Sequence, residues 1–352
     1  MISIGQKTIG NDSPCYITLE AGPTINGFDS AKQLIDIAAN TGADAIKFQL
    51  LNANELVADK EQQFKYEILI NAEKQQTKKI SESLYDILKR RELTDDEWKE
   101  LKKYCDKKNI EFFGTILSDH YLELIKELKT NTVKIASSDI NHIPLIVKAA
   151  KTGMCIQLDT GNASYDEIAY AIKKIEEQGN DKIIIHHCPT GYPAEIESVQ
   201  LAEISKLKSL FPYPIAFSDH TPGWHMNIAA ICLGANMVEK TITVDRTTPS
   251  VEHMFSLEKN EVQKFIKEIR EVEKAIKDTE RKLNPDLKKR YATRRSMFSK
   301  CNIEKGTRIT EEHIEYKRPG LGLGPERLDD ICFKFAKNDI PAGTMISLDQ
   351  LN

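Results

Sequence analysis

The sequence predicts an α/β fold, a closed (β/α)8 barrel of the TIM type followed by a small C-terminal β module. Short apolar, β-branched runs alternate with amphipathic helical patterns, which is typical of repeated strand–helix units with a parallel sheet. The chain has 352 residues, and a barrel takes about 250, so a second unit must account for the remainder. An internal repeat near the C-terminus indicates where that unit lies.

Eight runs fit strands of the barrel. They lie at residues 15–20, 43–49, 111–115, 132–136, 155–159, 182–187, 214–218 and 236–241. Between them, stretches with apolar residues at three- and four-residue spacing predict helices, for example at residues 30–40, 95–108, 165–178 and 199–210. Eight alternations favour a closed barrel over an open sheet, because consecutive parallel pairing then leaves no edge strand.

The C-terminal part of the sequence differs from the barrel part in composition and pattern. After a long charged helix predicted at residues 259–277, Pro285 and the basic run Lys288-Lys289-Arg290 indicate a linker. Residues 298–309 then match residues 335–346 position by position, each around a Gly-Thr pair. We therefore expect a barrel at residues 1–280, a linker at 281–293 and a compact, pseudo-symmetric β module at 294–352. A module of about 60 residues is only marginally stable alone and is expected to pack against another protein surface.

The charge balance excludes some classes of function. The net charge is -4 with 29% charged residues, so no basic face and no nucleic-acid partner are expected. No run reaches the roughly 18 apolar residues that span a bilayer, and the N-terminus lacks the apolar segment of a signal peptide. We expect a cytoplasmic protein with no membrane contact. The 7 cysteines are scattered without any Cys-x-x-Cys, which argues against a disulfide framework and a structural zinc site.

Polar residues gather where the predicted strands end. In barrel enzymes the active site forms at the C-terminal ends of the strands. The ring of strand ends reads Glu20; Lys47 and Gln49; Thr115; Lys134 and Ser137; Asp159 and Thr160; His187 and Cys188; Ser218, Asp219 and His220; Glu239 and Lys240. Burying such charges without partners would be expensive. We therefore expect an anionic ligand there.

The two lysines of this ring have two interpretations. Lys47 and Lys134 lie inside apolar runs, where a surface lysine is not expected. They either bind an anion or form structural ion pairs with Glu20 or Asp159. Clusters of this kind mark functional sites without proving them.

The histidines of the ring are also ambiguous. His220 follows the seventh predicted strand in a loop, so its functional interpretation depends on the charged residues around it. His186 and His187 are adjacent on one strand, so their side chains point to opposite faces and only one can line the barrel interior.

Several motifs occur in order along the chain. The barrel part contains Glu20-Ala21-Gly22, Lys47-Phe48-Gln49, Lys134-Ile135-Ala136-Ser137, Tyr192-Pro193, Ser218-Asp219-His220-Thr221 and Glu239-Lys240, and the tail contains Arg295-Ser296 and Lys317-Arg318-Pro319-Gly320. This ordered set resembles the N-acetylneuraminate synthase family, which includes sialic, legionaminic and pseudaminic acid synthases. The tail resembles the antifreeze-like (SAF) domain of that family, which has a β-clip fold.

The resemblance implies an enzyme that condenses phosphoenolpyruvate with the aldehyde of an N-acetylated amino sugar similar to N-acetylmannosamine, giving a nonulosonic acid and phosphate. It also implies a divalent metal, Mn²⁺ or Mg²⁺, and a domain-swapped homodimer in which each SAF domain caps the other subunit's barrel. The resemblance places five residues around phosphoenolpyruvate: Lys47, Thr115, Lys134, Ser137 and Ser218. Those that would face the sugar are Glu20, Gln49, Tyr192 and Glu252, and Arg318 would reach it from the other subunit. His220 would bind the metal, and Asp159 and Thr190 are further predicted substrate-binding positions. Glu20, Lys47, Lys134, His220 and Glu252 are the predicted catalytic residues.

Some positions depart from the family pattern. The second metal-binding histidine of the family is Thr241 here, and a hydroxyl is a poorer ligand for a transition ion than imidazole. A serine after the fifth strand is Asp159, and an aspartate near the last strand is Glu252. We therefore expect an unusual acceptor sugar or altered metal use, with the same donor.

Two other functions stay open. A metal-dependent keto-acid aldolase or lyase would form a Schiff base on Lys47 or Lys134. A catalytically altered relative would bind the sugar without turning it over, and Thr241 keeps this possibility open.

Overall fold

The computed structural model describes residues 2–277, 283 and 285–352. Contacts divide the chain into two compact units, Met1–Lys277 and Asp278–Asn352. The predicted boundary between residues 280 and 281 lies outside the described residues.

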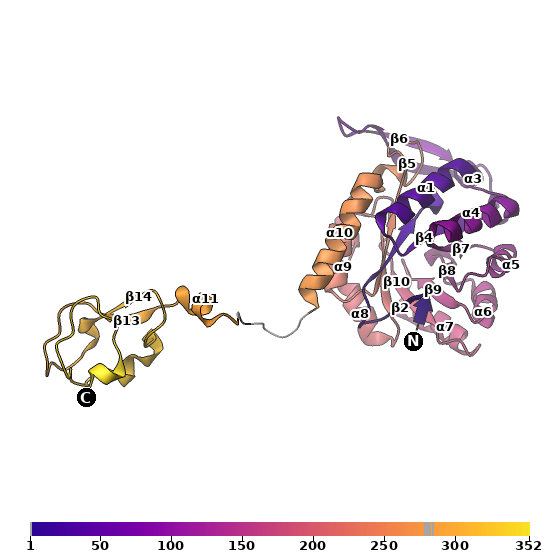
Figure 1. The fold of residues 1–352 in the computed structure, drawn as a ribbon. Coiled ribbons are helices and arrows are strands. Elements are labelled where there is room, and N and C mark those ends of the chain that lie inside the picture. The colour runs from indigo at the N-terminus through magenta and orange to yellow at the C-terminus, as the bar shows by residue number, and fades with distance from the viewer. Residues whose placement is uncertain (1, 278–282, 284) are drawn as a thin grey trace. The chain divides into compact units, whose positions relative to one another are not determined.

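The first unit is a closed (β/α)8 barrel, which confirms the predicted fold class (Figure 1). Neighbouring strands pair in parallel and follow chain order around the barrel. The strands are β3 (Tyr16–Glu20), β4 (Ala45–Leu50), β7 (Glu111–Ile116), β8 (Thr132–Ile135), β9 (Cys155–Asp159), β10 (Ile183–His187), β11 (Ile215–Asp219) and β12 (Met237–Thr241).

A helix follows each barrel strand and packs outside it. These helices are α1 (Phe28–Thr41), α4 (Asp95–Lys108), α5 (Asp119–Glu127), α6 (Ile143–Lys151), α7 (Tyr165–Glu176), α8 (Ala202–Leu210), α9 (His225–Cys232) and α10 (Lys259–Ile276). Local sequence sets their ends: Thr94 and Glu97 form a capping box at the start of α4, and Gly42 ends α1 with a φ of 85°. Among the residues described, no helix has the length and apolar content needed to cross a membrane.

The amino-terminal end of the barrel is sealed by a hairpin that the sequence analysis did not predict. Strands β1 (Ile2–Ile4) and β2 (Lys7–Ile9) pair antiparallel. Ile2, Ile4 and Ile9 pack into one apolar cluster with residues near the strand starts, including Tyr16 and Met237. Because this end is filled by apolar side chains, the polar residues at the opposite strand ends are the accessible ones.

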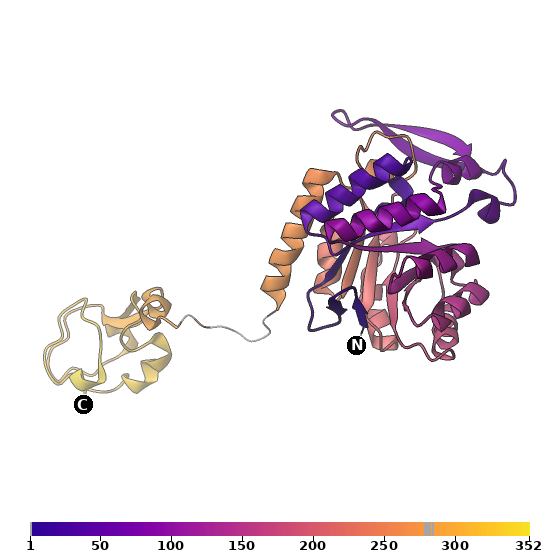
Figure 2. The same cartoon turned by 45° about the vertical axis from the view of Figure 1, so that its right-hand side comes forward.

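A second unpredicted hairpin stands beside the carboxyl ends of the strands. It is inserted between β4 and α4 and contains α2 (Ala53–Leu56), β5 (Gln63–Asn71), β6 (Gln76–Ser83) and α3 (Leu84–Lys89). Figures 1 and 2 show it at the end of the barrel away from the N-terminus. Tyr66, Ile68 and Ile87 pack with Val251 in a small separate core, which fixes the insertion to the loop after β12.

The second unit is a small β structure built on the predicted repeat. It contains α11 (Leu287–Ala292) and an antiparallel pair, β13 (Ser296–Ser299) and β14 (Ile314–Lys317). Ile303 and Ile340, at equivalent positions of the two copies, form an antiparallel bridge, and Gly306 and Gly343 both have positive φ, 83° and 78°. The two copies therefore form the same turn and share one core.

Candidate active site

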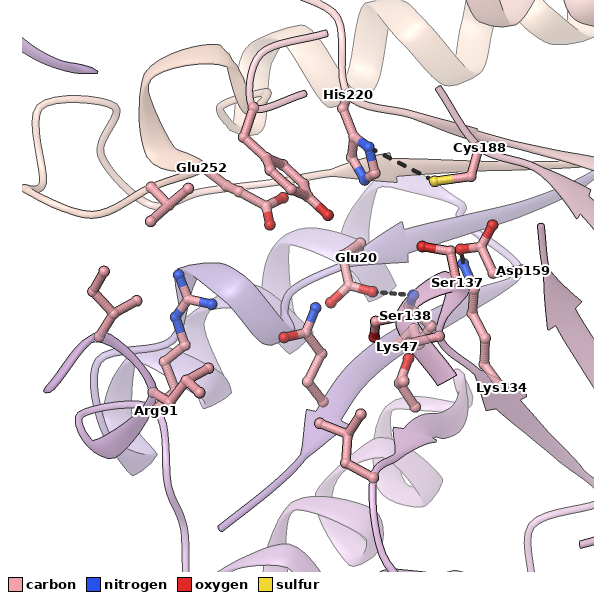
Figure 3. A pocket seen from close by; sticks show the side chains of 18 of the residues that line it. Glu20, Lys47, Arg91, Lys134, Ser137, Ser138, Asp159, Cys188, His220 and Glu252 are labelled. Carbon is pink, nitrogen blue, oxygen red and sulfur yellow. Dashed lines mark hydrogen bonds and ion pairs between the residues drawn. The ribbon is translucent and has the colours of Figure 1, made fainter. Parts of the chain in front are cut away.

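A cavity of about 340 Å³ opens at the carboxyl ends of the barrel strands (Figure 3). Its walls come from the barrel strand ends, the loops that follow them and the β5–β6 insertion. The polar lining comprises Glu20, Lys47, Gln49, Arg91, Thr115, Lys134, Ser137, Ser138, Asp159, Cys188, Tyr192, His220, Glu239 and Glu252. The apolar lining comprises Phe64, Leu84, Ile87, Leu88, Leu117, Ala136 and Val251.

Two buried lysines and three carboxylates form an ion network at the cavity floor. The Nζ atoms of Lys47 and Lys134 lie 2.6 and 2.8 Å from the same carboxylate oxygen, Oε1 of Glu239. Lys47 also pairs with Glu20, and Lys134 lies 2.9 Å from Asp159. Every member is at most 5% exposed. The ion pairs with Glu20 and Asp159 that the sequence left open are therefore both present.

Burial and neighbouring charges act differently on the two ammonium groups. Burial lowers the pKa of Lys47, Glu239 partly offsets this and Lys134 adds to it, so that the pKa is about 8. Burial would also lower the pKa of Lys134, but Asp159 and Glu239 together outweigh it and raise that pKa. Lys134 therefore stays charged, whereas Lys47 loses its proton within an accessible pH range.

A buried hydrogen-bonded chain lies behind Lys134. Lys134 donates to the hydroxyl of Ser218 (2.9 Å), which lies 2.9 Å from Nδ1 of His186, and the Nε2 atom of His186 lies 3.0 Å from Oε1 of Gln157. Burial and the charge of Lys134 lower the pKa of His186 to about 3, so its ring is neutral. The chain fixes the position of Lys134 without using a charge.

A second group of polar side chains lies toward the mouth. The rings of Tyr192 and His220 are 4.8 Å apart, and Nδ1 of His220 lies 3.3 Å from the carbonyl oxygen of Pro189. The Thr241 hydroxyl donates to Oε2 of Glu252 at 3.3 Å. Glu252 and His220 thus face the cavity from the loops after β12 and β11 (Figure 3).

Most of the predicted site residues line this one cavity. Ser218 and Thr241 are buried and bonded to Lys134 and Glu252 respectively. Thr190 is exposed and lines a neighbouring hollow. Arg318 belongs to the second unit, so its proposed contact with the sugar stays a prediction. The cavity residues that match the prediction are Glu20, Lys47, Gln49, Thr115, Lys134, Ser137, Asp159, Tyr192, His220 and Glu252.

Besides Ser218, four residues of the predicted ring are not part of the cavity lining: Thr160, His187, Asp219 and Lys240. The buried hydroxyl of Thr160 donates to the carbonyl oxygen of His186, and the other three side chains point away from the cavity. His187 packs against Phe217 and lies 2.7 Å from the carbonyl oxygen of Val199, so His186 is the histidine that faces inward. Lys240 and Asp219 form a fully buried ion pair, 2.8 Å long, between the strands and the helices. Side chains alternate along a strand, and these three have the parity of the outward-facing residues.

Sequence reasoning missed the importance of Arg91 and Glu239. Glu239 was recognised only as a polar strand end, although it is the carboxylate that both lysines share. Arg91 lies in the insertion within a charged stretch that reads as solvent-exposed, yet its side chain is buried in the cavity wall. Nothing in the local pattern distinguishes Arg91 from the neighbouring Arg90.

The donor set does not fit the two-histidine metal site of the family, since His220 is the one metal-binding histidine that the sequence predicted and Thr241 stands at the position of the second. Across residues 2–277, 283 and 285–352, no three His, Cys, Asp or Glu side chains are grouped so that they could hold a metal ion. The hydroxyl of Thr241, at the position of the second histidine, is bonded to Glu252. We therefore derive no step through a metal, and a requirement for Mn²⁺ or Mg²⁺ stays a prediction.

The fold and the charged cavity are those of a (β/α)8-barrel enzyme. The chain belongs to the NeuB family, whose model matches residues 34–281, and the SAF domain model matches residues 294–352. It is 33% identical to an N,N'-diacetyllegionaminic acid synthase of Campylobacter jejuni over 94% of this chain and 98% of that protein. It is 32% identical to a pseudaminic acid synthase of Helicobacter pylori over 91% and 93%.

A solved structure agrees with this assignment. The N-acetylneuraminic acid (sialic acid) synthetase of Leptospira borgpetersenii is similar with a TM-score of 0.71 and 30% identity, over 82% of this chain and 94% of that one.

Proposed function

We propose that this enzyme condenses phosphoenolpyruvate with the open-chain aldehyde of an N-acylated amino sugar, giving a nonulosonic acid and phosphate. The observation that carries the proposal is the convergence of Lys47 and Lys134 on one carboxylate oxygen at the floor of a strand-end cavity. The similarity to legionaminic, pseudaminic and sialic acid synthases supports the choice of substrates.

The two ammonium groups would hold the anionic donor. Its phosphate and carboxylate oxygens would replace the carboxylate oxygens that now surround Lys47 and Lys134, aided by the hydroxyls of Thr115 and Ser137. The aldehyde would sit toward the mouth, near His220 and Glu252. C3 of the donor would attack the aldehyde carbon, and the resulting alkoxide would take a proton from His220. Water would then add at C2 and give one proton to the imidazole of His220, which restores the proton it gave to the alkoxide. Collapse of the resulting hemiketal would break the bond between C2 and the phosphate oxygen, and the second proton of the water would leave with the phosphate.

Phosphate release tests this proposal. The enzyme would be supplied with phosphoenolpyruvate, Mn²⁺ or Mg²⁺ and a panel of N-acetylated hexosamines and bacillosamine-type sugars, with products identified by mass spectrometry. We expect phosphate and a nine-carbon keto acid in equal amounts. Absence of phosphate release with every sugar would refute the proposal.

A Schiff-base aldolase is a second candidate, because burial lowers the pKa of Lys47 to about 8 and thereby favours a nucleophilic amine. Borohydride reduction in the presence of a keto acid would add the mass of that acid less one oxygen atom to the protein if this candidate were right, because the Schiff base forms with loss of water and is then reduced. The proposed condensation forms no such adduct.

The predicted domain-swapped homodimer belongs to the same proposal. The partner subunit's cap would carry Arg318 to the sugar, and sedimentation of the full chain would test the dimer. Loss of activity in Arg318→Ala with an unchanged dimer is the expected result.

A further inference from the structure

Arg91 is a buried cation that uses few of its hydrogen-bond donors. It is 5% exposed and lies just after α3 at the cavity wall. Its one hydrogen bond among the described residues runs from Nη2 to the Ser250 hydroxyl, at 3.3 Å, and its buried Nε atom has no partner there. Arg90, the preceding residue, is in contrast paired with the carboxylate of Glu82 through both terminal nitrogens.

A carboxylate faces Arg91 without reaching it. Glu252 exerts the strongest favourable charge on the guanidinium, whose pKa burial lowers. No carboxylate of the described chain lies within 4.0 Å of Arg91 in an ion pair, and the hydrogen bond of Glu252 comes from Thr241. Figure 3 shows Arg91 and Glu252 on the same side of the cavity with space between them. Arg91 and Glu252 thus supply a hydrogen-bond donor and an acceptor to one part of the cavity without bonding to each other.

The surroundings of this pair are apolar. Ile87 and Val251 belong to the small core of the insertion and also line the cavity, together with Phe64, Leu84 and Leu88. A ligand group placed here would meet one cationic donor, one carboxylate acceptor and an aliphatic wall.

These three features select among the substituents of an amino sugar. A carboxylate or phosphate would pair with Arg91 but would be repelled by Glu252. A free ammonium would be repelled by Arg91. A hydroxyl would leave the aliphatic wall unfilled. An acylamino group offers a carbonyl acceptor, an N–H donor and a methyl group, and it matches all three features.

We propose that Arg91, Glu252 and the aliphatic wall of the β5–β6 insertion form a subsite for an acylamino substituent of the acceptor sugar. Arg91 donates to the acyl oxygen, Glu252 accepts the amide N–H, and the methyl group packs against Ile87 and Val251. This inference rests on the proposed function and assigns acceptor specificity to the insertion.

Equilibrium binding separates this inference from the proposed function. The probes are N-acetylmannosamine, mannosamine, mannose and the corresponding 4-acetamido sugars, titrated calorimetrically with the full chain. We expect the wild type to bind at least one acetamido sugar more tightly than its hydroxyl and amino counterparts. Arg91→Met, which keeps length and removes the donors, should reduce that preference by about 10- to 100-fold. Lys89→Met, on the exposed side of α3, should not change it.

Each result of these binding measurements either supports or overturns the proposed subsite. Arg91→Lys keeps the charge and an ammonium donor group but loses the planar guanidinium, so an intermediate loss of preference supports the subsite even if the methionine variant fails to fold. An unchanged preference in Arg91→Lys and Arg91→Met overturns it, and so does a wild type without preference for acetamido sugars. Tighter Arg91-dependent binding of a mannuronate or a mannose 6-phosphate would show an anion site instead. Arg91-dependent acetamido binding without phosphate release would refute the proposed function and leave the subsite standing.

Discussion

Replacing Glu239 by glutamine tests the ion network most directly. The change keeps the shape of the side chain but removes the charge that lies 2.6 and 2.8 Å from two ammonium groups. Removing one partner of a buried ion pair costs about 3–5 kcal/mol. For a domain of this size about 1 kcal/mol shifts the melting temperature by about 2–4 °C, so we expect Tm to fall by roughly 6–20 °C.

An added anion should restore part of that loss if the lysines form the donor site. In Glu239→Gln, inorganic phosphate can bind to the two ammonium groups. At a concentration of 100 times its Kd, this binding adds about 2.7 kcal/mol to the free energy of unfolding. Scanning calorimetry at a series of phosphate concentrations and constant ionic strength measures the resulting rise in Tm. Asp219→Asn is the matched control, because it breaks the equally buried pair with Lys240 outside the cavity and should gain nothing specific from phosphate. Equal phosphate responses of both variants would refute the reasoning.

Three further changes have defined outcomes. Lys47 loses its charge above pH about 8 while Lys134 keeps its own, so the affinity for phosphoenolpyruvate, measured by calorimetry, should fall as pH rises through that value. The Lys47→Arg variant should not show this fall. A wild-type affinity that does not depend on pH would contradict the role of Lys47 in binding the donor. Thr241→His should raise Mn²⁺ affinity at least tenfold by equilibrium dialysis, because imidazole is the better ligand; unchanged affinity would show that this position does not face a metal. A Cβ on Gly22 would lie 2.6 Å from the backbone nitrogen of Gln49, so Gly22→Ala should lower Tm and slow phosphate release together; an unchanged Tm would show that the backbone yields freely.

The barrel was predictable because its signal is local and repeated. Each strand is a short apolar run, and each lies within two residues of its predicted position, as for β9 at Cys155–Asp159. The helix Asp95–Lys108 was predictable to the residue, because Thr94 and Glu97 mark its start. Burial on both faces of a parallel strand produces a continuous apolar run, and the polar interruptions, such as Lys47 and Lys134, then stand out.

The remaining features depend on contacts that no local pattern encodes. The hairpin β1–β2 consists of two three-residue strands, too short for any periodicity. The burial of Arg91 follows from how the insertion folds over the strand ends. The sequence also left open whether Lys47 and Lys134 pair with carboxylates, since this depends on which residues of separate strands meet across the barrel.

In the part of the chain that the structure describes, the hairpin β1–β2 closes the amino-terminal end of the barrel, and the cavity opens at the other end. With Ile2, Ile4 and Ile9 filling the amino-terminal end, a ligand reaches Lys47 and Lys134 through the opposite mouth of the barrel, in a cavity whose lining includes Arg91 and Glu252. A sugar seated at this mouth would block the way to the floor. Productive turnover should therefore require the three-carbon donor to enter before the aldehyde. A non-reactive acceptor that also binds the free enzyme should show mixed inhibition against the donor, because it blocks donor entry as well as binding to the donor complex.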